Sequence, residues 1–439
     1  IRWTLWSTRH QCPKSHADFL LWDTVDQKSG RINRETKCPS CTFNADRRKF
    51  KVIGNEPAVV AFSRQDGSKG ERTATKQDHA DATRFAGEDC RAPFPDVVLD
   101  ADREMHRRCA LHLQGIRNVR DMYTDRNRLA LSILWRAIQN ETNHRLRACL
   151  AFAFTNTAWH GTRMRRFNAR GGHRPLTGTL YVPQLSAEAN VLQLMRNKLR
   201  QLKSYYRAFQ PVDVEPPHVM SESATDLSRI PDNSIDYVFT DPPFGSNIFY
   251  ADCNLIWESW LGRATDPNLE AVVNRSLQPA DGGKTLDDYS ALIEASLAEI
   301  ARVLKPGGWA TIVFHNTDSE VWRSLSKAAA SAGFIFHEAA SLDRKQQSHK
   351  GYKGRGGAEN VAHFDVVMNL QKPKEGAVEE PRERQMLDVG ALVEDARAIP
   401  GVTDRGVQGV HAEIMRRLMS EGRTEFPDFQ QVRQAYSQS

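Results

Sequence analysis

The stretch Asp241-Pro242-Pro243-Phe244 places a carboxylate, two rigid residues and an aromatic ring within four positions. It follows Ile235–Phe239, a β-branched and aromatic run that is typical of a buried strand. The prolines cannot continue a central strand and donate no backbone hydrogen bond, so the Asp241 carboxylate and the Pro242 carbonyl remain as rigidly placed acceptors. Ligands bind at the carboxyl ends of strands in open parallel α/β sheets. We therefore expect a ligand site at Asp241.

Two neighbouring acceptors of this kind suit an amino group attached to an aromatic ring. Such a nitrogen is a poor nucleophile, because its lone pair is delocalised into the ring. Acceptors that bind both N–H groups out of the ring plane localise that lone pair. Phe244 would stack on a nucleobase and replace the stacking lost when the base leaves a duplex. The cluster favours methyl transfer from a positively charged donor, since the proton leaves after the attack and no strong general base is needed.

A second group of residues has the spacing of metal ligands. Cys38-Pro-Ser-Cys41 is typical of a zinc knuckle, in which two thiolates separated by two residues bind one tetrahedral ion. Upstream, Cys12 is followed three residues later by a serine, so the partner ligand there would be His16 or His10. We predict a structural zinc ion held by Cys12, His16, Cys38 and Cys41. A degenerate ribbon that no longer binds metal is the alternative.

Composition limits the class of protein. The chain has 439 residues, of which 40% are hydrophobic and 26% charged, as in ordinary globular proteins of two to four domains. It has no apolar run of eighteen residues, so no membrane span is predicted. The first residue is Ile1, which suggests a start inside a longer gene product. Seven unevenly spread cysteines argue for a reducing compartment, and we predict a cytoplasmic location.

A net charge of +6 gives a mild bias toward polyanionic partners. Two segments concentrate the basic residues. "HGTRMRRFNARGGHRP" contains Arg165 and Arg166, and it is either a solvated loop or an arm that contacts phosphates. "RKQQSHKGYKGRGG" contains Lys350 and Lys353 and joins two expected hairpin strands. If the first of these strands runs parallel to the strand before Asp241, this loop opens on the same edge of the sheet.

Strand and helix patterns alternate from residue 217 onward, which predicts a mostly parallel sheet with helices on its faces. We expect a strand in "HVMSESATDL", a helix over Leu286–Leu304 capped by Thr285 and Asp288, and a helix capped by Thr317 and Glu320. Farther upstream, residues 64–92 are polar and read as an exposed loop, and a helix over 185–210 follows a Ser186 cap. The expected divisions are a zinc-ribbon-like module over 1–60, a polar insertion over 61–101, a helical insertion over 102–212, a catalytic core over 213–372 and a helical tail over 373–439.

Longer stretches resemble a known family. "TDPPF" resembles the Asp-Pro-Pro-aromatic motif of S-adenosylmethionine-dependent amino-methyltransferases, and "RVLKPGGWATIVFHN" resembles the passage that follows it in their fold. "CPKSH…KCPSC", "LTGTLYVPQLSAEANVL" and "SATDLSRIPDNSIDYVFTDPPFGSNIFYADCNLIWESWL" together resemble bacterial DNA methylases with an inserted zinc ribbon, usually described as adenine-specific. The resemblance covers most of residues 1 to 372. It implies an α/β fold with a partial Rossmann-like methyltransferase sheet, of which the later strands are present, and an N-terminal zinc-ribbon-like and helical insertion.

The resemblance also implies roles for individual residues. It makes Asp241, Pro242, Pro243 and Phe244 the catalytic motif, and it places Asp226 and Asp241 beside the cofactor S-adenosylmethionine. DNA would be contacted by residues of the motif, its following loop and the basic segments, namely Phe244, Ser246, Asn247, Tyr250, Arg165, Arg166, Lys350 and Lys353.

One departure from the family pattern concerns the glycine-rich loop that binds the methionine part of the cofactor. Neither "RGG" at 170–172 nor "PGG" at 306–308 follows a strand and opens a helix. In the family this loop precedes the zinc ribbon, which is consistent with a truncated start. Two other readings remain open: methylation of a guanine amine in RNA, and a non-catalytic DNA-binding module that has lost the cofactor site. An aspartate at the first motif position favours adenine N6 over cytosine N4.

Overall fold

The computed structural model describes residues 1–343 and 364–438, apart from residues 28, 86–93, 210–214, 216, 317, 375–386 and 424. The chain forms two compact units. The first comprises Ile1–Pro216 and Phe249–Pro267, and the second comprises Pro217–Ile248 and Asn268–Ser439. Each unit is described by itself below.

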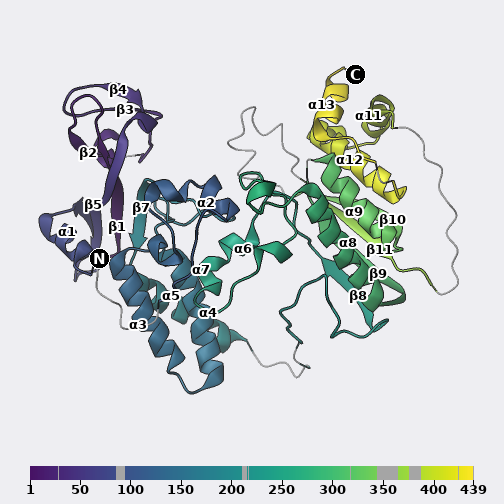
Figure 1. Ribbon diagram of the computed structural model, residues 1–439, viewed down its shortest axis with the longest axis horizontal. Helices are drawn as coiled ribbons and strands as arrows, with labels where there is room; N and C mark the ends of the chain where they lie inside the picture. The colour runs from purple at the N-terminus through teal and green to yellow at the C-terminus, as the bar shows by residue number, and fades with distance from the viewer. Residues whose placement is uncertain are drawn as a thin grey trace. The chain divides into compact units, whose positions relative to one another are not determined.

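The first unit is built on an antiparallel sheet whose central strand is β1 (Figure 1). β1 pairs with β5 along its whole length, with β7 over its first half and with β2 at its end. Leu5, Leu21, Ala58 and Leu185 form a buried cluster against this sheet. A separate two-stranded ribbon, β3 with β4, lies in the segment that contains Cys38 and Cys41. The strands are β1 (Trp3–Gln11), β2 (Asp18–Leu20), β3 (Glu35–Lys37), β4 (Asn44–Asp46), β5 (Lys51–Ser63), β6 (Lys69–Thr73) and β7 (Leu185–Ala189).

Helices complete the first unit, and two expectations about this region are wrong. Residues 64–92 are not simply a loop, since β6 pairs with β5 and α1 begins at a Thr75–Asp78 capping box. Ser186 is not a helix cap but a residue of β7, and Asn190 caps the following helix instead. The sequence reading failed at both places because pairing with β1 and β5 outweighed local polarity and spacing. The helices are α1 (Lys76–Thr83), α2 (Glu104–Arg108), α3 (Asp125–Gln139), α4 (His144–Gly161), α5 (Val191–Ala208), α6 (Tyr250–Cys253) and α7 (Leu255–Glu258).

The second unit contains a four-stranded sheet in the order β10-β11-β9-β8. β8 is parallel to β9, and β11 is antiparallel to both β9 and β10, so β10 runs parallel to β8. The predicted hairpin is therefore confirmed, and the carboxyl end of its first strand lies on the same edge of the sheet as the carboxyl end of β8. The strands are β8 (Ile235–Thr240), β9 (Leu304–Phe314), β10 (Ile335–Asp343) and β11 (Phe364–Gln371).

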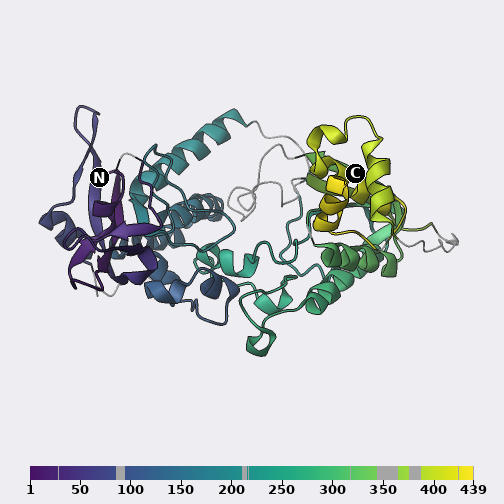
Figure 2. The same ribbon diagram turned by 90° about the horizontal axis from the view of Figure 1, so that it is seen from above.

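Helices cover one face of this sheet. Alternate residues of β9, Ala310, Ile312 and Phe314, are buried in one cluster with side chains of α8, α9 and α12. The helical tail thus packs into the same core as the sheet, and Figure 2 shows its helices gathered together in yellow-green. The helices are α8 (Leu286–Val303), α9 (Ser319–Ser331), α11 (Val389–Arg397), α12 (Val407–Ser420) and α13 (Phe429–Gln438).

The opposite face of the sheet is open at β8. Tyr237 and Phe239 are 53% and 62% exposed, although the sequence predicts a buried strand. Within the described residues β8 pairs with β9 alone, so it is an edge strand. Its aromatic residues alternate onto the face that α8, α9 and α12 do not cover.

Helix starts agree in part with expectation. The Thr285–Asp288 capping box is confirmed at the start of α8. Asp318 caps α9, whereas the sequence predicted Thr317, which lies outside the described residues. No helix in the described part of the chain combines the length and the apolar character that a membrane crossing needs.

Candidate active site at the end of β8

Asp241 lies directly after β8, at the carboxyl edge of the sheet, and it is exposed. Its exposure agrees with a carboxylate that meets a ligand rather than one that packs inside the unit. The loop that begins here runs through Pro242, Pro243 and Phe244 to Gly245. Because prolines fix the backbone angle φ, the loop has little freedom before any side chain holds it.

The backbone carbonyls of this loop differ in whether they accept a hydrogen bond. The Pro243 carbonyl accepts a 2.8 Å hydrogen bond from the Tyr289 hydroxyl. The Phe244 carbonyl accepts a 3.2 Å hydrogen bond from Asn316 Nδ2. The Pro242 carbonyl accepts no hydrogen bond from the residues that the structure describes. Two consecutive carbonyls therefore anchor the loop, and the one beside Asp241 keeps its lone pairs for another donor.

The two anchors come from the elements that flank β9. Tyr289 is fully buried in the first turns of α8, and burial raises the pKa of its phenol, so it stays a hydrogen-bond donor. Asn316 follows β9, and its backbone carbonyl accepts a 3.0 Å bond from Trp322 Nε1 of α9. Its side-chain Oδ1 accepts from the backbone N–H of Asp318. One asparagine thus joins β9, α9 and the loop after β8.

Gly245 is required by this arrangement. Its φ is +63°, which is the left-handed region that favours glycine. A Cβ at this position would lie 3.3 Å from Asn316 Nδ2 and 3.5 Å from Val321. Any larger residue would press on the asparagine that holds the Phe244 carbonyl.

The Phe244 ring is half-buried and packs against the core of the second unit. It meets the Phe314 ring edge-on, with centroids 5.3 Å apart and planes at 87°. The His315 ring lies 6.1 Å away. Phe314 therefore fixes the ring of Phe244 from the core side and leaves part of it exposed.

The remaining predicted substrate residues of this segment fall in different places. Ser246 is buried and Asn247 is half-buried, and both belong to the second unit. Tyr250 is 43% exposed, and it begins α6, which belongs to the first unit. Their contacts with a substrate stay predictions.

Asp226 does not follow a strand, contrary to expectation. Residues 218–227 have no regular secondary structure apart from a turn at 224–225, which the 3.1 Å hydrogen bond from Asp226 N–H to Ser223 O closes. A strand needs a neighbour, and no described strand pairs with this segment. The Asp226 carboxylate is exposed, and hydrogen bonds from the Ser228 hydroxyl and backbone N–H lower its pKa. Its contact with a cofactor stays a prediction.

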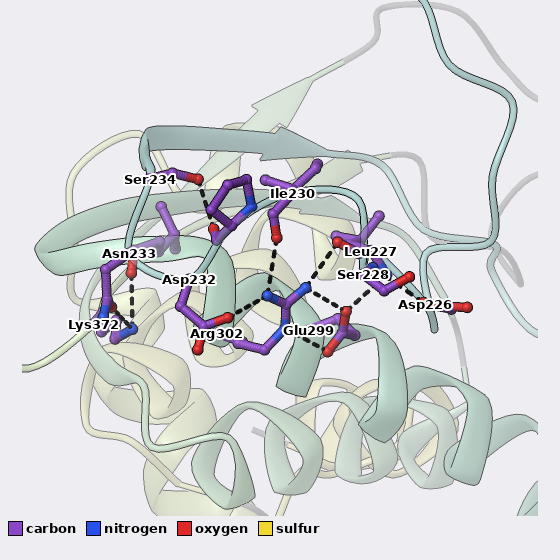
Figure 3. A network of polar contacts seen from close by, with 12 residues as sticks. Asp226, Leu227, Ser228, Ile230, Asp232, Asn233, Ser234, Glu299, Arg302 and Lys372 are labelled. Carbon is purple, nitrogen blue, oxygen red and sulfur yellow. Dashed lines mark hydrogen bonds and ion pairs between the residues drawn. The ribbon is translucent and has the colours of Figure 1, made fainter.

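A network around Arg302 holds the segment after Asp226 (Figure 3). Arg302 donates to the carbonyls of Leu227 and Ile230 and to the carboxylates of Asp232 and Glu299. Glu299 in turn accepts a 2.7 Å bond from the Leu227 N–H. The end of α8 therefore fixes residues 227–232, which lead into β8.

A thiol cluster in the first unit

Three of the four predicted zinc ligands converge. One sulfur each from Cys12, Cys38 and Cys41 lies within 4.8 Å of the others, and Cys12 Sγ is 3.6 Å from Cys41 Sγ. A tetrahedral ion with Zn–S bonds of about 2.3 Å separates its sulfurs by about 3.8 Å. Cys12 and Cys38 are fully buried. The arrangement fits three ligands of a zinc ion.

The two loops that carry these thiols have the same backbone form. His16 N–H donates to Cys12 O, and Thr42 N–H donates to Cys38 O, each at 3.0 Å. His16 and Thr42 both have a left-handed φ, of 56° and 57°. When the two loops are aligned on Cys12 and Cys38, Ser15 has the position of Cys41 and His16 has the position of Thr42.

The structure places Ser15 beside the cluster, because its Oγ lies 3.7 Å from Cys38 Sγ. His16 is exposed, and neither it nor His10 belongs to the converging group. His10 is buried, and its Nε2 lies 2.9 Å from Thr8 Oγ1. His16 as the fourth ligand stays a prediction, and the match of Cys-Pro-x-Ser to Cys-Pro-x-Cys makes Ser15 a second candidate.

Hydrogen bonds favour the thiolate forms of Cys12 and Cys38. Burial alone would raise the pKa of Cys12, but hydrogen bonds from Ser15 and the Lys14 backbone lower it to about 6. Burial also opposes ionisation of Cys38, and backbone and side-chain donors again lower its pKa. Thiolates are the form that binds zinc.

The predicted basic residues are only partly described. Arg165 is half-buried, donates to the His173 carbonyl at 2.8 Å and has no ion pair among the described residues. Burial lowers its pKa to about 10. Arg166 is exposed. Lys350 and Lys353 lie outside the described residues.

Comparison with known proteins

No protein-family model matches this chain. Its similar solved structures include a protein of Thermus thermophilus named as a DNA modification methylase, at 16% identity and a TM-score of 0.21. The match covers 42% of this chain and 60% of that one, and the same protein is also known in complex with S-adenosylmethionine. A methyltransferase of Methanosarcina mazei that depends on S-adenosylmethionine matches at 14% identity and a TM-score of 0.20, over 41% of this chain and 79% of that one.

These neighbours are methyltransferases at low identity and with partial coverage. This chain spans 60% of the length of the Thermus protein. The functional argument below therefore depends on the residues of this chain.

Proposed function

We propose that this chain binds the exocyclic amino group of a DNA base, adenine N6, for methylation by S-adenosylmethionine. The observation that carries the proposal is which backbone carbonyls after β8 accept a hydrogen bond. Those of Pro243 and Phe244 are bonded, and the Pro242 carbonyl beside the exposed Asp241 carboxylate accepts nothing from the described residues. Two acceptors on adjacent residues match the two N–H groups of an aromatic amine.

In this proposal Asp241 and Pro242 each accept one N–H of the amine and draw the nitrogen out of conjugation. Phe244, fixed by Phe314, contacts the face of the base. Tyr289 and Asn316 are positioning residues, since they hold the carbonyls that follow Pro242. Arg165, Arg166, Lys350 and Lys353 would contact DNA phosphates, and Ser246, Asn247 and Tyr250 would contact the nucleotide around the base.

S-adenosylmethionine, when bound, supplies a methyl group on a positively charged sulfur. The described residues do not provide the glycine-rich cradle for it. Gly171 ends a turn that Gly172 follows, Gly282 and Gly283 follow a 3-10 helix, and Gly307 and Gly308 lie inside β9. The described part of this chain thus supplies the amine side of the reaction, and Asp226 and Asp241 are its candidates on the cofactor side.

The test is incubation of the protein with labelled S-adenosylmethionine and, in parallel reactions, duplex DNA or structured RNA, followed by identification of the labelled nucleoside. We expect N6-methyladenine, and we expect Asp241→Ala to abolish labelling. Asp236→Asn is the matched control, because Asp236 is an exposed aspartate of β8, the strand that precedes Asp241, and pairs with Lys305. Wild-type labelling by Asp241→Ala would refute the assignment. Label in RNA N2-methylguanine would replace it with the RNA alternative, and DNA binding without any label would favour the non-catalytic one.

We also propose that a zinc ion holds the two cysteine loops together. Cys12, Cys38 and Cys41 would supply three thiolates, and the loop Cys12–His16 would supply the fourth ligand from Ser15 or His16. The ion would be structural, since a closed site of this kind stabilises a small ribbon outright. Metal analysis of the purified protein, with Cys41→Ser as the variant that loses the ion and Cys149→Ser as control, tests this.

A further inference from the structure

The first unit contains a hollow of about 290 Å³ that the proposed function does not use. Residues at the start of α3 and before it line one side, and Trp6 of β1 and Asn55 of β5 line another. Three arginines, Arg120, Arg128 and Arg163, reach it from different segments. All of its lining residues belong to the first unit.

The three guanidinium groups are rich in unused donors. A guanidinium carries five N–H donors. Within the described residues these three groups make one hydrogen bond between them, from Arg163 Nη1 to the Asp121 carbonyl at 3.1 Å. Arg128 forms an ion pair with Asp125 at 3.1 Å, and Arg120 lies 3.8 Å from Asp96. Most of the donors therefore have no acceptor in this part of the chain.

Arg163 is the least compensated of the three. No carboxylate lies within ion-pair distance of it among the described residues; burial lowers its pKa, and the nearby charges of Asp121 and Asp125 offset this effect only in part. A half-buried cation of this kind is costly unless an anion accompanies it. Both carboxylates of the lining already have partners. Asp125 forms an ion pair with Arg128, and Asp121 accepts hydrogen bonds from the backbone N–H groups of Arg117 and Asn118.

Asn55 adds a second unsatisfied group. Its Oδ1 is buried and has no hydrogen-bond partner among the described residues. The oxygen and nitrogen of an asparagine amide are interchangeable by rotation of the group. Asn55 would add donors to those of the arginines.

The walls of the hollow are rigid. Glu188 of β7 is buried and accepts hydrogen bonds from Trp6 Nε1 at 2.7 Å and from the Thr124 hydroxyl, both of which line the hollow. Arg126 neutralises Glu188 and also donates to Thr4 Oγ1 at 2.8 Å. The Tyr123 ring packs edge-on against Phe94 and Trp260. The lining is thus held in place without a ligand, which lowers the entropy cost of binding.

We propose that this hollow is a binding site for a phosphate group, held by Arg120, Arg128 and Arg163 with Asn55. Guanidinium groups match the oxygens of a phosphate in pairs, and several converging donors of this type are characteristic of phosphate recognition. The phosphate is either a free phosphate monoester or a phosphodiester of a nucleic-acid strand. This site is separate in the chain from the loop after β8, so the inference does not depend on the proposed methyl transfer.

The test is isothermal titration of the full chain with inorganic phosphate at constant ionic strength. We expect saturable binding that Arg163→Gln and Arg120→Gln each weaken by roughly tenfold. Arg200→Gln is the control, because Arg200 is an exposed arginine of α5 outside the lining. Arg120 is also well exposed, so its variant keeps the test decisive if Arg163→Gln does not fold. Circular dichroism establishes that each variant is folded.

Equal affinity in wild type, Arg120→Gln and Arg163→Gln overturns the proposal, as does an equal loss in Arg200→Gln or the absence of phosphate binding. A second titration, with phosphate added to the complex with a short duplex DNA, identifies the source. If the duplex displaces phosphate, the hollow takes a phosphodiester of the strand. If phosphate binds equally well beside DNA, the hollow takes a free phosphate monoester.

Discussion

The Tyr289 hydroxyl lies 2.8 Å from the Pro243 carbonyl oxygen, so a buried residue of α8 holds the centre of the loop that follows β8. The contact joins the helix that packs on the sheet to the residues at the sheet's carboxyl edge. Asn316 repeats it one residue later, from the end of β9. The core of the second unit thus anchors a loop that its prolines already restrict, directly after the proposed acceptors Asp241 and Pro242.

Tyr289→Phe removes this hydrogen bond and leaves the Pro243 carbonyl without its donor. We expect a loss of about 1 kcal/mol in unfolding free energy, since that is typical of one such bond. Because the acceptor pair loses its alignment, kcat for methyl transfer should fall on the order of tenfold with little change in KM for DNA. Steady-state kinetics and urea unfolding measure both effects. Tyr181→Phe, at an exposed tyrosine of the first unit, should change neither, and unaltered kcat in Tyr289→Phe would remove the positioning role.

Gly245→Ala should impair the same loop by a different route. The alanine adopts a left-handed φ at a cost of about 1–2 kcal/mol, and its Cβ presses on Asn316 and Val321. Gly171→Ala is a matched control, because Gly171 also has a left-handed φ, of +83°, with nothing within 4 Å of the added carbon. We expect both variants to lose stability and only Gly245→Ala to lose activity. Thermal unfolding and kinetics separate the two, and equal activity in both would show that the contact with Asn316 is unimportant.

Ser15→Cys should strengthen the thiol cluster. Ser15 occupies the position that Cys41 has in the other loop, so the variant restores a second Cys-x-x-Cys pair. We expect zinc affinity to rise roughly tenfold or more, because a fourth thiolate replaces a weaker ligand. Competition with a chromogenic chelator measures the affinity. With Ser15 as the fourth ligand, His16→Ala should leave the affinity unchanged; a loss of zinc in His16→Ala, with no gain in Ser15→Cys, would instead make His16 the fourth ligand, as the spacing predicted.

The Glu299–Arg302 network should make stability depend on pH. Hydrogen bonds from Arg302 and from the Leu227 N–H lower the pKa of Glu299 from 4.5 to about 2. A carboxyl group with a lowered pKa in the folded protein stabilises it above pH 4.5, and that contribution is lost as the pH falls toward about 2. The difference in unfolding free energy between wild type and Glu299→Gln should therefore shrink over this range. Urea unfolding at several pH values tests it, with the exposed Glu294→Gln of the same helix as a variant that shows no such trend.

Part of this architecture follows from local sequence patterns. The capping box of α8, the strand before Asp241 and the β10–β11 hairpin depend on neighbouring residues, and their patterns predict them. Residues 218–227 were expected to form a strand followed by a turn. The turn is present at 224–225 and the strand is not, since a strand also requires a partner, and the sequence does not state which partners a segment will have.

The candidate site, too, could be predicted from the sequence only in part. The proposed acceptors Asp241 and Pro242 are adjacent in sequence, so a short motif is enough to predict them. Tyr289 and Asn316 lie far from them in the chain and meet the loop only through the packing of α8 and the end of β9. The periodicity of α8 marks Tyr289 as a core residue and gives no sign of its hydroxyl's partner.

The exposed aromatic face of β8 has a consequence for handling the protein. An edge strand with unpaired backbone groups and apolar side chains is a template for association between molecules. Within the described residues β8 pairs with β9 alone, which leaves backbone groups on its other side unpaired, and Tyr237 and Phe239 are its exposed apolar side chains. Concentrated samples should therefore aggregate through this strand, and a lysine in place of Phe239 should improve solubility without disturbing the helices on the other face.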